Sequence, residues 1–218
     1  MSRRRDDLRR RRSFLEPRTR VLICCEGEVT EPSYLNGLKR KLQIRLVHIE
    51  VVPGGVDPKT LVDEAVDRKK EAERQARTQK DDNLKYDEVW CVFDVDVHQY
   101  VPEAKQKAEA NKVNVAISNP CFELWLLLHF QDRGAHIERH QVQSLCRGHM
   151  PGYVKEVPFE RLFPRYAEAV QRADALDHWQ TTRGCAGENP STGVHRLTER
   201  IMALGREEQL KKHRQPGR

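Results

Sequence analysis

The stretch RVLICCEGEVTEPSYL, residues 20–35, places a short apolar run directly before a group of glutamates. The apolar run, 21–25, predicts a buried β-strand, because strands that are covered on both faces read as continuous hydrophobic segments. Glu26 follows this strand at once. Thr30 can cap a helix, and Pro32 suits the first turn of that helix. The stretch therefore predicts a strand, a turn and a helix, with a carboxylate at the carboxyl end of the strand.

The rest of the chain repeats this alternation of strands and helices. Further strands are predicted over 44–52, 86–96 and 112–118. Further helices are predicted over 57–82, 101–111, 119–130, 162–180 and 191–212. Asn119 is expected to cap the third of these helices, and Ser191 or Thr192 the last. The alternation favours an α/β fold with a mostly parallel central sheet, helices on both faces and a C-terminal helical extension.

The length of the chain favours one folded domain. At 218 residues the chain can bury one sizeable hydrophobic core. We assign this domain to 18–205, in which the weakly patterned segment 131–160 is expected to be an insertion or a long loop. Residues 206–218 are expected to fray. No apolar run approaches the length of a membrane-spanning helix, so we expect no membrane association and a soluble, cytoplasmic protein.

Positive charge is concentrated at the N-terminus. The formal net charge of the chain is +6. Residues 1–12 contain seven Arg and two Asp, which is +5, so the remaining chain is only +1. We predict that 1–17 is a disordered basic arm, either a solvated tail or an arm that attracts nucleic-acid phosphates. The arginines that would contact phosphate are Arg9, Arg10, Arg11 and Arg12.

Two aspartates end the third predicted strand. Asp94 and Asp96 are two residues apart, so on an extended strand both carboxylates project to the same side, with their Cα atoms about 6.6 Å apart. Two such charges repel one another unless a cation lies between them. Hard oxygen ligands favour Mg²⁺ or Mn²⁺. The alternative is that both aspartates only cap the strand end and the following turn.

Other glutamates can join these aspartates at the carboxyl edge of the sheet, where parallel α/β folds form their sites. Glu26 follows the first strand. Glu123 lies in an apolar helix, where a carboxylate is costly unless it is paired, hydrogen-bonded or bound to a cation. We interpret Glu28 as a loop residue and Glu31 as a charge that suits the helix dipole.

One group of residues resembles the spacing of zinc ligands. His136 and His140 are four apart and would share a helix face. Cys146 and His149 follow shortly after. The spacing matches no common zinc signature, and we favour surface histidines over a structural zinc site.

Four motifs in this sequence resemble those of one protein family. They are CEGEVTEPSYL, VFDVDVH, SNPCFELWLLLHF and NPSTGVHRL. In this order they resemble the RloB-like family of bacterial proteins, and the resemblance extends from about residue 18 to about residue 200. The basic arm lies outside these motifs.

The resemblance implies a Toprim fold, the small α/β domain shared by primases, topoisomerases and several nucleases. In such a fold the metal ligands would be Glu26, Asp94 and Asp96. The element GYVK would make Lys155 a phosphate contact or a charge stabiliser, with a surface lysine as the alternative. The resemblance also implies a role in bacterial anti-phage defence or abortive infection, often beside an ATPase partner protein.

Residues and resemblance together predict a metal-dependent nuclease that hydrolyses phosphodiester bonds in DNA or RNA. Glu123 would complete the metal site, and Glu26 could also act as general base. His98 is a candidate for protonating the leaving group, and Arg196 for contacting nucleic acid. Two alternatives stay open. One is another metal-dependent phosphoryl transfer, and the other is a non-catalytic protein that binds nucleic acid or a partner.

Overall fold

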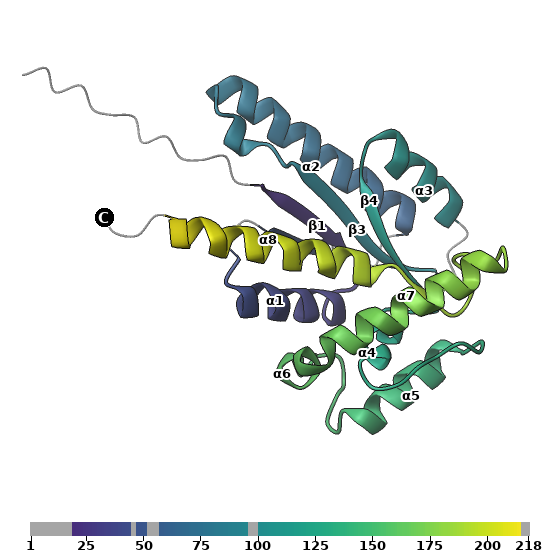
Figure 1. Ribbon diagram of the computed structural model, residues 1–218. Helices are drawn as coiled ribbons and strands as arrows, with labels where there is room; N and C mark the ends of the chain where they lie inside the picture. The colour runs from purple at the N-terminus through teal and green to yellow at the C-terminus, as the bar shows by residue number, and fades with distance from the viewer. Residues whose placement is uncertain (1–18, 45–46, 52–56, 96–99, 215–218) are drawn as a thin grey trace, which may run out of the picture.

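The computed structural model describes residues 19–44, 47–51, 57–95 and 100–214 (Figure 1). Its strands are β1 (Val21–Cys25), β2 (Val47–Val51), β3 (Glu88–Asp94), β4 (Asn114–Asn119) and β5 (Ser191–Thr192). Its α-helices are α1 (Thr30–Leu42), α2 (Pro58–Gln79), α3 (Val101–Ala110), α4 (Glu123–Leu128), α5 (Arg139–His149), α6 (Phe159–Leu162), α7 (Tyr166–Thr182) and α8 (Val194–Arg214). Two 3₁₀ turns are η1 (Asp82–Leu84) and η2 (Phe163–Arg165).

The strands form a sheet in the order β2-β1-β3-β4-β5. The first four strands in this order are parallel, and β5 pairs antiparallel with the end of β4. Helices cover both faces of the sheet, and α8 closes the described part of the chain (Figure 1). The predicted α/β class with a mostly parallel sheet and a C-terminal helix is therefore confirmed.

Alternating side chains of the central strands build two separate hydrophobic cores. In β1, Val21, Ile23 and Cys25 face the core that includes α1, α4 and α8. Leu22 and Cys24 face the core formed with α2 and α3. All five β1 side chains are completely buried. This double burial explains why the strand has no polar position.

Two helix caps differ from the sequence prediction. Thr30 is the first residue of α1 rather than its cap, which is Val29 and makes no side-chain capping bond. Asn119 still belongs to β4, where it pairs with Ser191, and its amide donates to the Gly187 carbonyl oxygen at 3.1 Å. β5 extends the pairing of β4 through Asn119. The helix predicted over 119–130 therefore begins only at Glu123, the first residue of α4.

The short strand β5 was missed. Ser191 and Thr192 were expected to cap the last helix, yet they pair with Asn119 and Ser118 at the sheet edge. Thr192 Oγ1 still accepts a hydrogen bond from the Val194 amide at the start of α8, at 3.3 Å. A strand of two residues has no periodicity that a sequence could display, which explains the error.

The segment 131–160, expected to be an insertion or a long loop, contains an ordered helix. Helix α5 begins with a capping box, in which the Glu138 side chain and the Gln141 side chain each accept a bond from the other residue's backbone amide. Val142 and Cys146 are its buried residues, and the helix packs against α4. Apart from these two residues, only the partly buried Leu145 of α5 packs against the core, so the apolar pattern of the helix is weak.

Several predictions concern residues outside the described ranges. The basic arm 1–17 and the ends of the second and third predicted strands belong to this group. Within the described ranges, each helix is too short or too polar to cross a membrane.

Two glycines of the helices should respond oppositely to substitution by alanine. A Cβ on Gly37 of α1 would lie 2.4 Å from Cγ of the buried Phe159. A Cβ on Gly148 of α5 would meet no atom within 4 Å. We expect Gly37→Ala to lower the unfolding free energy by about 1–3 kcal/mol through overpacking, despite the better helix propensity of alanine. Gly148→Ala should raise it by about 0.5–1 kcal/mol.

Urea denaturation followed by circular dichroism measures both values. A stabilising Gly37→Ala would show that α1 does not pack tightly against Phe159.

Candidate functional site

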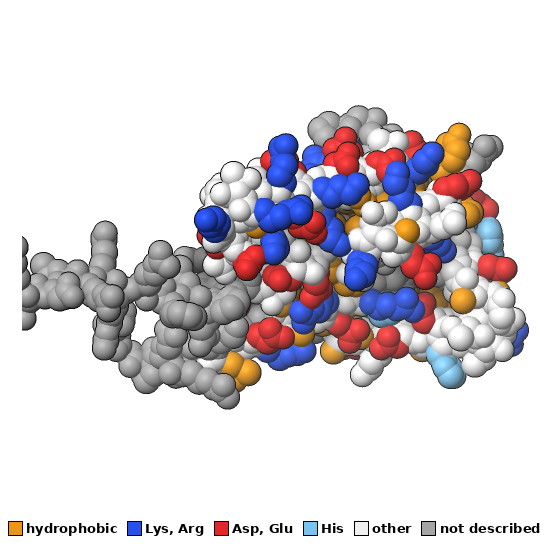
Figure 2. All heavy atoms as spheres, turned by 90° about the horizontal axis from the view of Figure 1, so that it is seen from above, with side chains coloured by type: hydrophobic (Ala, Val, Ile, Leu, Met, Phe, Trp, Pro, Cys, Tyr) orange, Lys and Arg blue, Asp and Glu red, His pale blue; other side chains and the backbone are white. Residues whose placement is uncertain are grey.

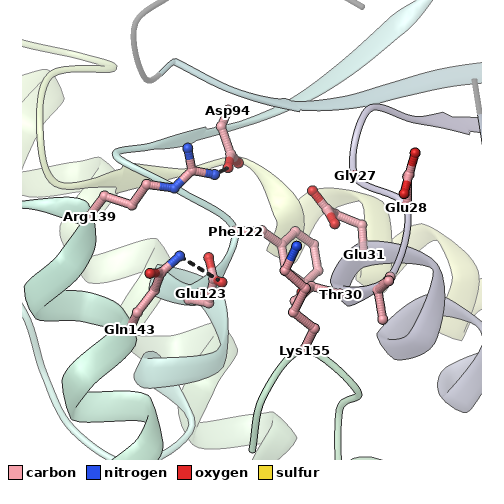
Figure 3. Close-up of a pocket in the computed structure, with 11 residues that line it drawn as sticks. Gly27, Glu28, Thr30, Glu31, Asp94, Phe122, Glu123, Arg139, Gln143 and Lys155 are labelled. Atoms are coloured by element: carbon pink, nitrogen blue, oxygen red, sulfur yellow. Dashed lines mark hydrogen bonds and ion pairs between the residues drawn. The ribbon is translucent and has the colours of Figure 1, made fainter. Parts of the chain in front are cut away.

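A pocket of about 260 Å³ opens at the carboxyl edge of the sheet, where β1 and β3 end (Figure 3). Several separate segments surround it: the turn after β1, the first turn of α1, the end of β3, the start of α4, helix α5 and the loop before α6. Its lining residues are Gly27, Glu28, Val29, Thr30, Glu31, Asp94, Phe122, Glu123, Arg139, Gln143 and Lys155. Carboxylates and two cations therefore share one small space.

Backbone pairing brings Glu26 and Asp94 together. Glu26 continues the line of β1, and its amide donates to the Val92 carbonyl oxygen of β3 at 3.0 Å. The Glu26 carboxylate then accepts a hydrogen bond from the Asp94 amide at 3.3 Å. Asp94 is the last residue of β3 and is buried. The sequence predicted this proximity, since parallel strands end at one edge of the sheet.

Glu31 is a member of the site that sequence reasoning missed. It lies in the first turn of α1, only 6% exposed, and its carboxylate points into the pocket (Figure 3). A Cβ on Gly27 would lie about 2 Å from this carboxylate, so a larger residue at position 27 would force the Glu31 side chain to move. The available signal was the spacing: Glu31 is five residues after Glu26, across a glycine turn that points the helix start at the strand edge.

Burial and neighbouring charge perturb this carboxylate. Burial first, and then the negative charges of Glu123 and Glu26, raise the pKa of Glu31 to about 7. A carboxyl group that titrates near neutral pH lies where a neighbouring positive charge would be stabilising.

Glu123 enters the pocket from the other side. It is the first residue of α4, buried with its apolar neighbours. Its Oε1 accepts a hydrogen bond from Gln143 Nε2 of α5 at 3.2 Å (Figure 3). A buried carboxylate is costly unless it has partners, and this hydrogen bond supplies one of them. The prediction that Glu123 lies at the same edge as Glu26 and Asp94 is thus consistent with the geometry.

Arg139 stands beside Asp94, one of the buried carboxylates of the pocket. Its Nη2 lies 3.1 Å from Oδ2 of Asp94, in an ion pair whose aspartate side chain is 11% exposed. Burial, followed by the charge of Glu31, raises the pKa of Asp94 well above its ordinary value, and Arg139 opposes that rise. Arg139 was not predicted, because it lies in the segment that was expected to be a loop.

Lys155 supplies the second cation. The residue is exposed on the loop between α5 and α6, and its side chain points into the pocket (Figure 3). Lys155 therefore lies beside the acidic residues of the pocket. Its role as a phosphate contact stays a prediction.

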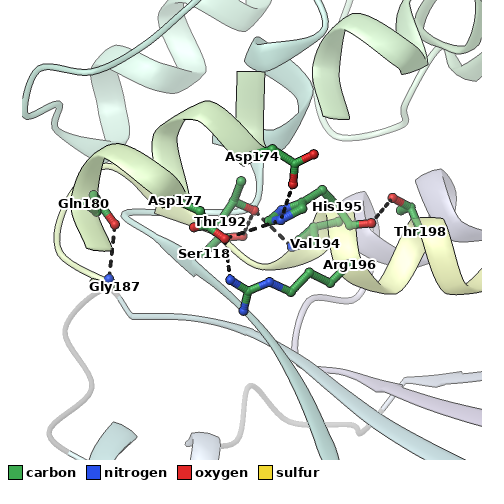
Figure 4. A network of polar contacts seen from close by, with 10 residues as sticks. All are labelled: Ser118, Asp174, Asp177, Gln180, Gly187, Thr192, Val194, His195, Arg196 and Thr198. Atoms are coloured by element: carbon green, nitrogen blue, oxygen red, sulfur yellow. Dashed lines mark hydrogen bonds and ion pairs between the residues drawn. The ribbon is translucent and has the colours of Figure 1, made fainter. Parts of the chain in front are cut away.

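Other predicted site residues lie elsewhere or outside the described ranges. Asp96, His98 and the arginines 9–12 lie outside. Arg196 is not among the residues that line the pocket; it pairs with Asp177 of α7 (Figure 4). Asp177 also lies 3.4 Å from Nε2 of the buried His195. These contacts join α7 to α8.

The four residues with zinc-like spacing do not converge. His136 bonds to Glu138, and His149 bonds to Gln131. The Cys146 thiol donates to the Glu123 carbonyl oxygen. Across the described residues, no three His, Cys, Asp or Glu side chains form a group that could hold a metal ion, and this applies to the acidic pocket as well.

Comparison with known proteins identifies a family. The family model described as RloB-like protein matches residues 21–201, which is most of the chain and includes every segment that surrounds the pocket. The resemblance seen in the sequence motifs is confirmed. No curated protein and no solved structure matches the chain, so the likeness to Toprim domains stays a prediction.

The raised pKa of Glu31 predicts a dependence of stability on pH. Because the folded protein binds this proton more tightly than the unfolded chain, the contribution is complete below about pH 4.5 and is lost as the pH rises through about 7. Without divalent cations, Glu31→Gln should raise the unfolding free energy by up to about 3 kcal/mol at about pH 8. The gain should be much smaller at about pH 5.

Denaturation in EDTA at both pH values measures this difference. Glu28→Gln, which removes an exposed carboxylate from the same pocket, is the matched control and should change stability by less than about 0.5 kcal/mol. An equal effect of Glu31→Gln at both pH values would contradict the assigned cause.

Proposed function

This chain belongs to the RloB-like family, and from that membership and its acidic pocket we propose that it is a divalent-metal-dependent nuclease. The reaction would be hydrolysis of phosphodiester bonds in DNA or RNA. The observation that carries the proposal is the gathering of Glu31, Asp94 and Glu123, all buried, from three separate elements around one pocket. A cation bound among these carboxylates would relieve their mutual repulsion.

The donor chemistry of the pocket suits Mg²⁺ or Mn²⁺. Carboxylate oxygens are the ligands that these hard cations prefer. We propose Glu26, Asp94 and Asp96 as the principal ligands, with Glu123 beside them. A bound cation would lower the pKa of a water molecule and neutralise charge on the phosphoryl oxygens. The described carboxylates would have to close around the ion, since as they stand no three of them form a binding group.

Other side chains in or near the pocket have proposed roles in charge balance, positioning and proton transfer. Lys155 and Arg139 bring positive charge to a pocket that a phosphate anion would otherwise not enter. Gln143 holds the Glu123 carboxylate in place. Glu26 is the proposed general base, because it is only half-buried and lies beside Asp94. His98 is the proposed donor of a proton to the leaving group.

Substrate capture is proposed to involve more than the folded surface. Over α2 and α3, basic and acidic side chains are interspersed (Figure 2). The chain beyond residue 12 has a net charge of only +1. We therefore propose that Arg9, Arg10, Arg11 and Arg12 contribute long-range attraction for nucleic acid, with Arg196 as a further contact.

A biological context is proposed from family resemblance alone. The protein would act in the cytoplasm as an effector in bacterial anti-phage defence, together with an ATPase partner. The partner would supply substrate binding or activation that the nearly neutral folded part lacks.

One observation favours a second candidate function. In the structure Asp94 is paired with Arg139, so the buried carboxylate has a counter-charge from the protein itself. Such a pocket can be stable without a metal ion. A non-catalytic protein that binds nucleic acid or a partner would need no more than this.

The nuclease proposal predicts loss of cleavage when the central carboxylate is neutralised. Purified protein is incubated with plasmid, single-stranded DNA and total tRNA, in Mg²⁺ or Mn²⁺ and in EDTA. We expect cleavage only with metal, and a loss of at least about 100-fold in Asp94→Asn and Glu26→Gln, because removing a ligand weakens both cation binding and charge stabilisation.

Asp67→Asn is the matched control, since Asp67 is an exposed aspartate of α2. It should retain full activity. Metal-dependent cleavage that survives in Asp94→Asn would remove Asp94 from the catalytic site, and cleavage that persists in EDTA would exclude the metal mechanism.

A further inference from the structure

Trp179 is a surface tryptophan in the last turn of α7. Of the three tryptophans in the chain, Trp125 is completely buried and Trp90 is partly buried, whereas Trp179 is 42% exposed. The Arg183 guanidinium lies over its ring, 4.5 Å from the ring centroid. The two residues are four apart, and Arg183 is the C-cap of α7, so they share one side of the helix end. This stacked pair presents an aromatic ring and a planar cation to solvent.

The helical turn that carries Trp179 is fixed by its neighbour, Gln180. Gln180 is buried, and its side chain bonds to the segment between α7 and β5 (Figure 4). Its Nε2 donates to the carbonyl oxygens of Glu188 and Pro190 at 2.8 and 2.6 Å, and its Oε1 accepts from the Gly187 amide at 3.1 Å. The ring therefore stands on an ordered support, which reduces the entropy that a ligand would lose in ordering the surface.

The same segment connects the pair to the carboxyl edge of the sheet. Asn119, the last residue of β4, donates its side-chain amide to the Gly187 carbonyl oxygen at 3.1 Å. β4 is the neighbour of β3, whose last residue, Asp94, lines the acidic pocket. The Asn189 side chain makes two hydrogen bonds to the backbone of Ile137, just before α5 begins, each at 3.0 Å. The segment thus lies between the support of Trp179 and one wall of the pocket.

The charges near the ring favour an anionic ligand. A Cβ on Gly187 would lie 4.0 Å from Nζ of Lys105 in α3, so this ammonium group lies beside the segment. Lys105 and Arg183 are both exposed, and neither forms an ion pair with another residue that the structure describes. The segment 183–190 contains one acidic side chain, that of Glu188. Two cations available to a ligand are therefore set against one carboxylate.

An exposed aromatic ring beside such cations suits an unpaired nucleic-acid strand. Every base has a π-face that can stack on an aromatic side chain or on a guanidinium plane, while nearby cations attract the backbone phosphates. In a duplex the bases already stack on one another, so their faces are not available to the ring. The chemistry of the pair therefore favours a single strand over a duplex.

We propose that Trp179 and Arg183 form a stacking site for a base of single-stranded DNA or RNA, outside the acidic pocket. This inference rests on the proposed function and deepens it, because it names the unpaired strand as the substrate class. Stacking on Trp179 needs no divalent cation and no movement of the residues that line the pocket. A strand held there would extend along the carboxyl edge of the sheet toward the end of β3.

The proposal predicts that Trp179→Ala weakens the binding of a single strand roughly tenfold, because a stacking partner is lost. Fluorescence anisotropy in EDTA measures the affinity for a labelled oligothymidylate, for the corresponding oligouridylate and for a duplex. Trp179→Ala should leave the duplex affinity within about twofold of the wild type. Trp179→Phe keeps an aromatic ring, so its single-strand affinity should stay within about threefold.

Tryptophan emission gives a second readout, which a merely structural role would not change. A base stacked on Trp179 should quench the emission of the wild-type protein when the single strand is added. The quenching should be absent in Trp179→Phe, although this variant still binds, since Trp90 and Trp125 are partly or completely buried.

Leu210→Ala is the matched control for the loss of an exposed apolar side chain. Leu210 is 62% exposed near the end of α8, which lies away from the end of α7 (Figure 1). This variant should keep every affinity within about twofold of the wild type. Thermal unfolding confirms that each variant is folded.

The outcomes separate this inference from the proposed nuclease. A single-strand affinity of Trp179→Ala within about twofold of the wild type overturns the stacking site, and so does wild-type emission that the strand does not change. An equal loss of single-strand and duplex affinity overturns the preference for an unpaired strand. The cleavage assay with Asp94→Asn tests the nuclease independently of all three. Stacking without cleavage would keep this site and support the non-catalytic function.

Discussion

Repulsion among buried carboxylates at the ends of β1 and β3 is the constraint on which the site depends. Glu31, Asp94 and Glu123 are each at most 8% exposed, and their charges act on one another. Such a group is tolerated only where protons or cations compensate the negative charge. The pocket shows both forms of compensation: Glu31 retains a proton to about pH 7, and Arg139 pairs with Asp94.

The surrounding fold supplies the rigidity that this arrangement requires. β1 is buried on both faces, and this burial fixes the position of Glu26 and of the turn that follows the strand. On the opposite side, Asn189 clamps the backbone of Ile137 and thereby positions the start of α5. The NPSTGVHRL motif, which contains Asn189, is thus explained in part by structure. It positions the start of α5, which forms one wall of the pocket. Its Ser191 and Thr192 form β5 at the sheet edge.

The sequence alone was sufficient to predict the central strands. It was also sufficient to predict that Glu26, Asp94 and Glu123 lie at the carboxyl edge of the sheet. The apolar runs before Glu26 and Asp94 are continuous because these strands are buried on both sides, and strong burial leaves a strong pattern. Glu31 and Arg139 left no such pattern. A glutamate in a first helical turn is explained equally well by the helix dipole, and an arginine after a weakly patterned loop looks like a surface residue. Only their approach to Asp94 in space distinguishes them.

The energetic cost of the pocket bears on its interpretation. Burial, and after it the repulsion between carboxylates, raises the pKa of Glu31 and Asp94. Apolar residues of similar volume would remove both effects, so the pocket as it stands lowers stability at neutral pH. A purely structural ion pair would need one carboxylate for Arg139, and the others would add only cost. A binding surface for a partner or for nucleic acid would likewise gain nothing from acids buried below the rim. The cation that we propose for this pocket would account for all of them at once, because it would convert their repulsion into binding energy.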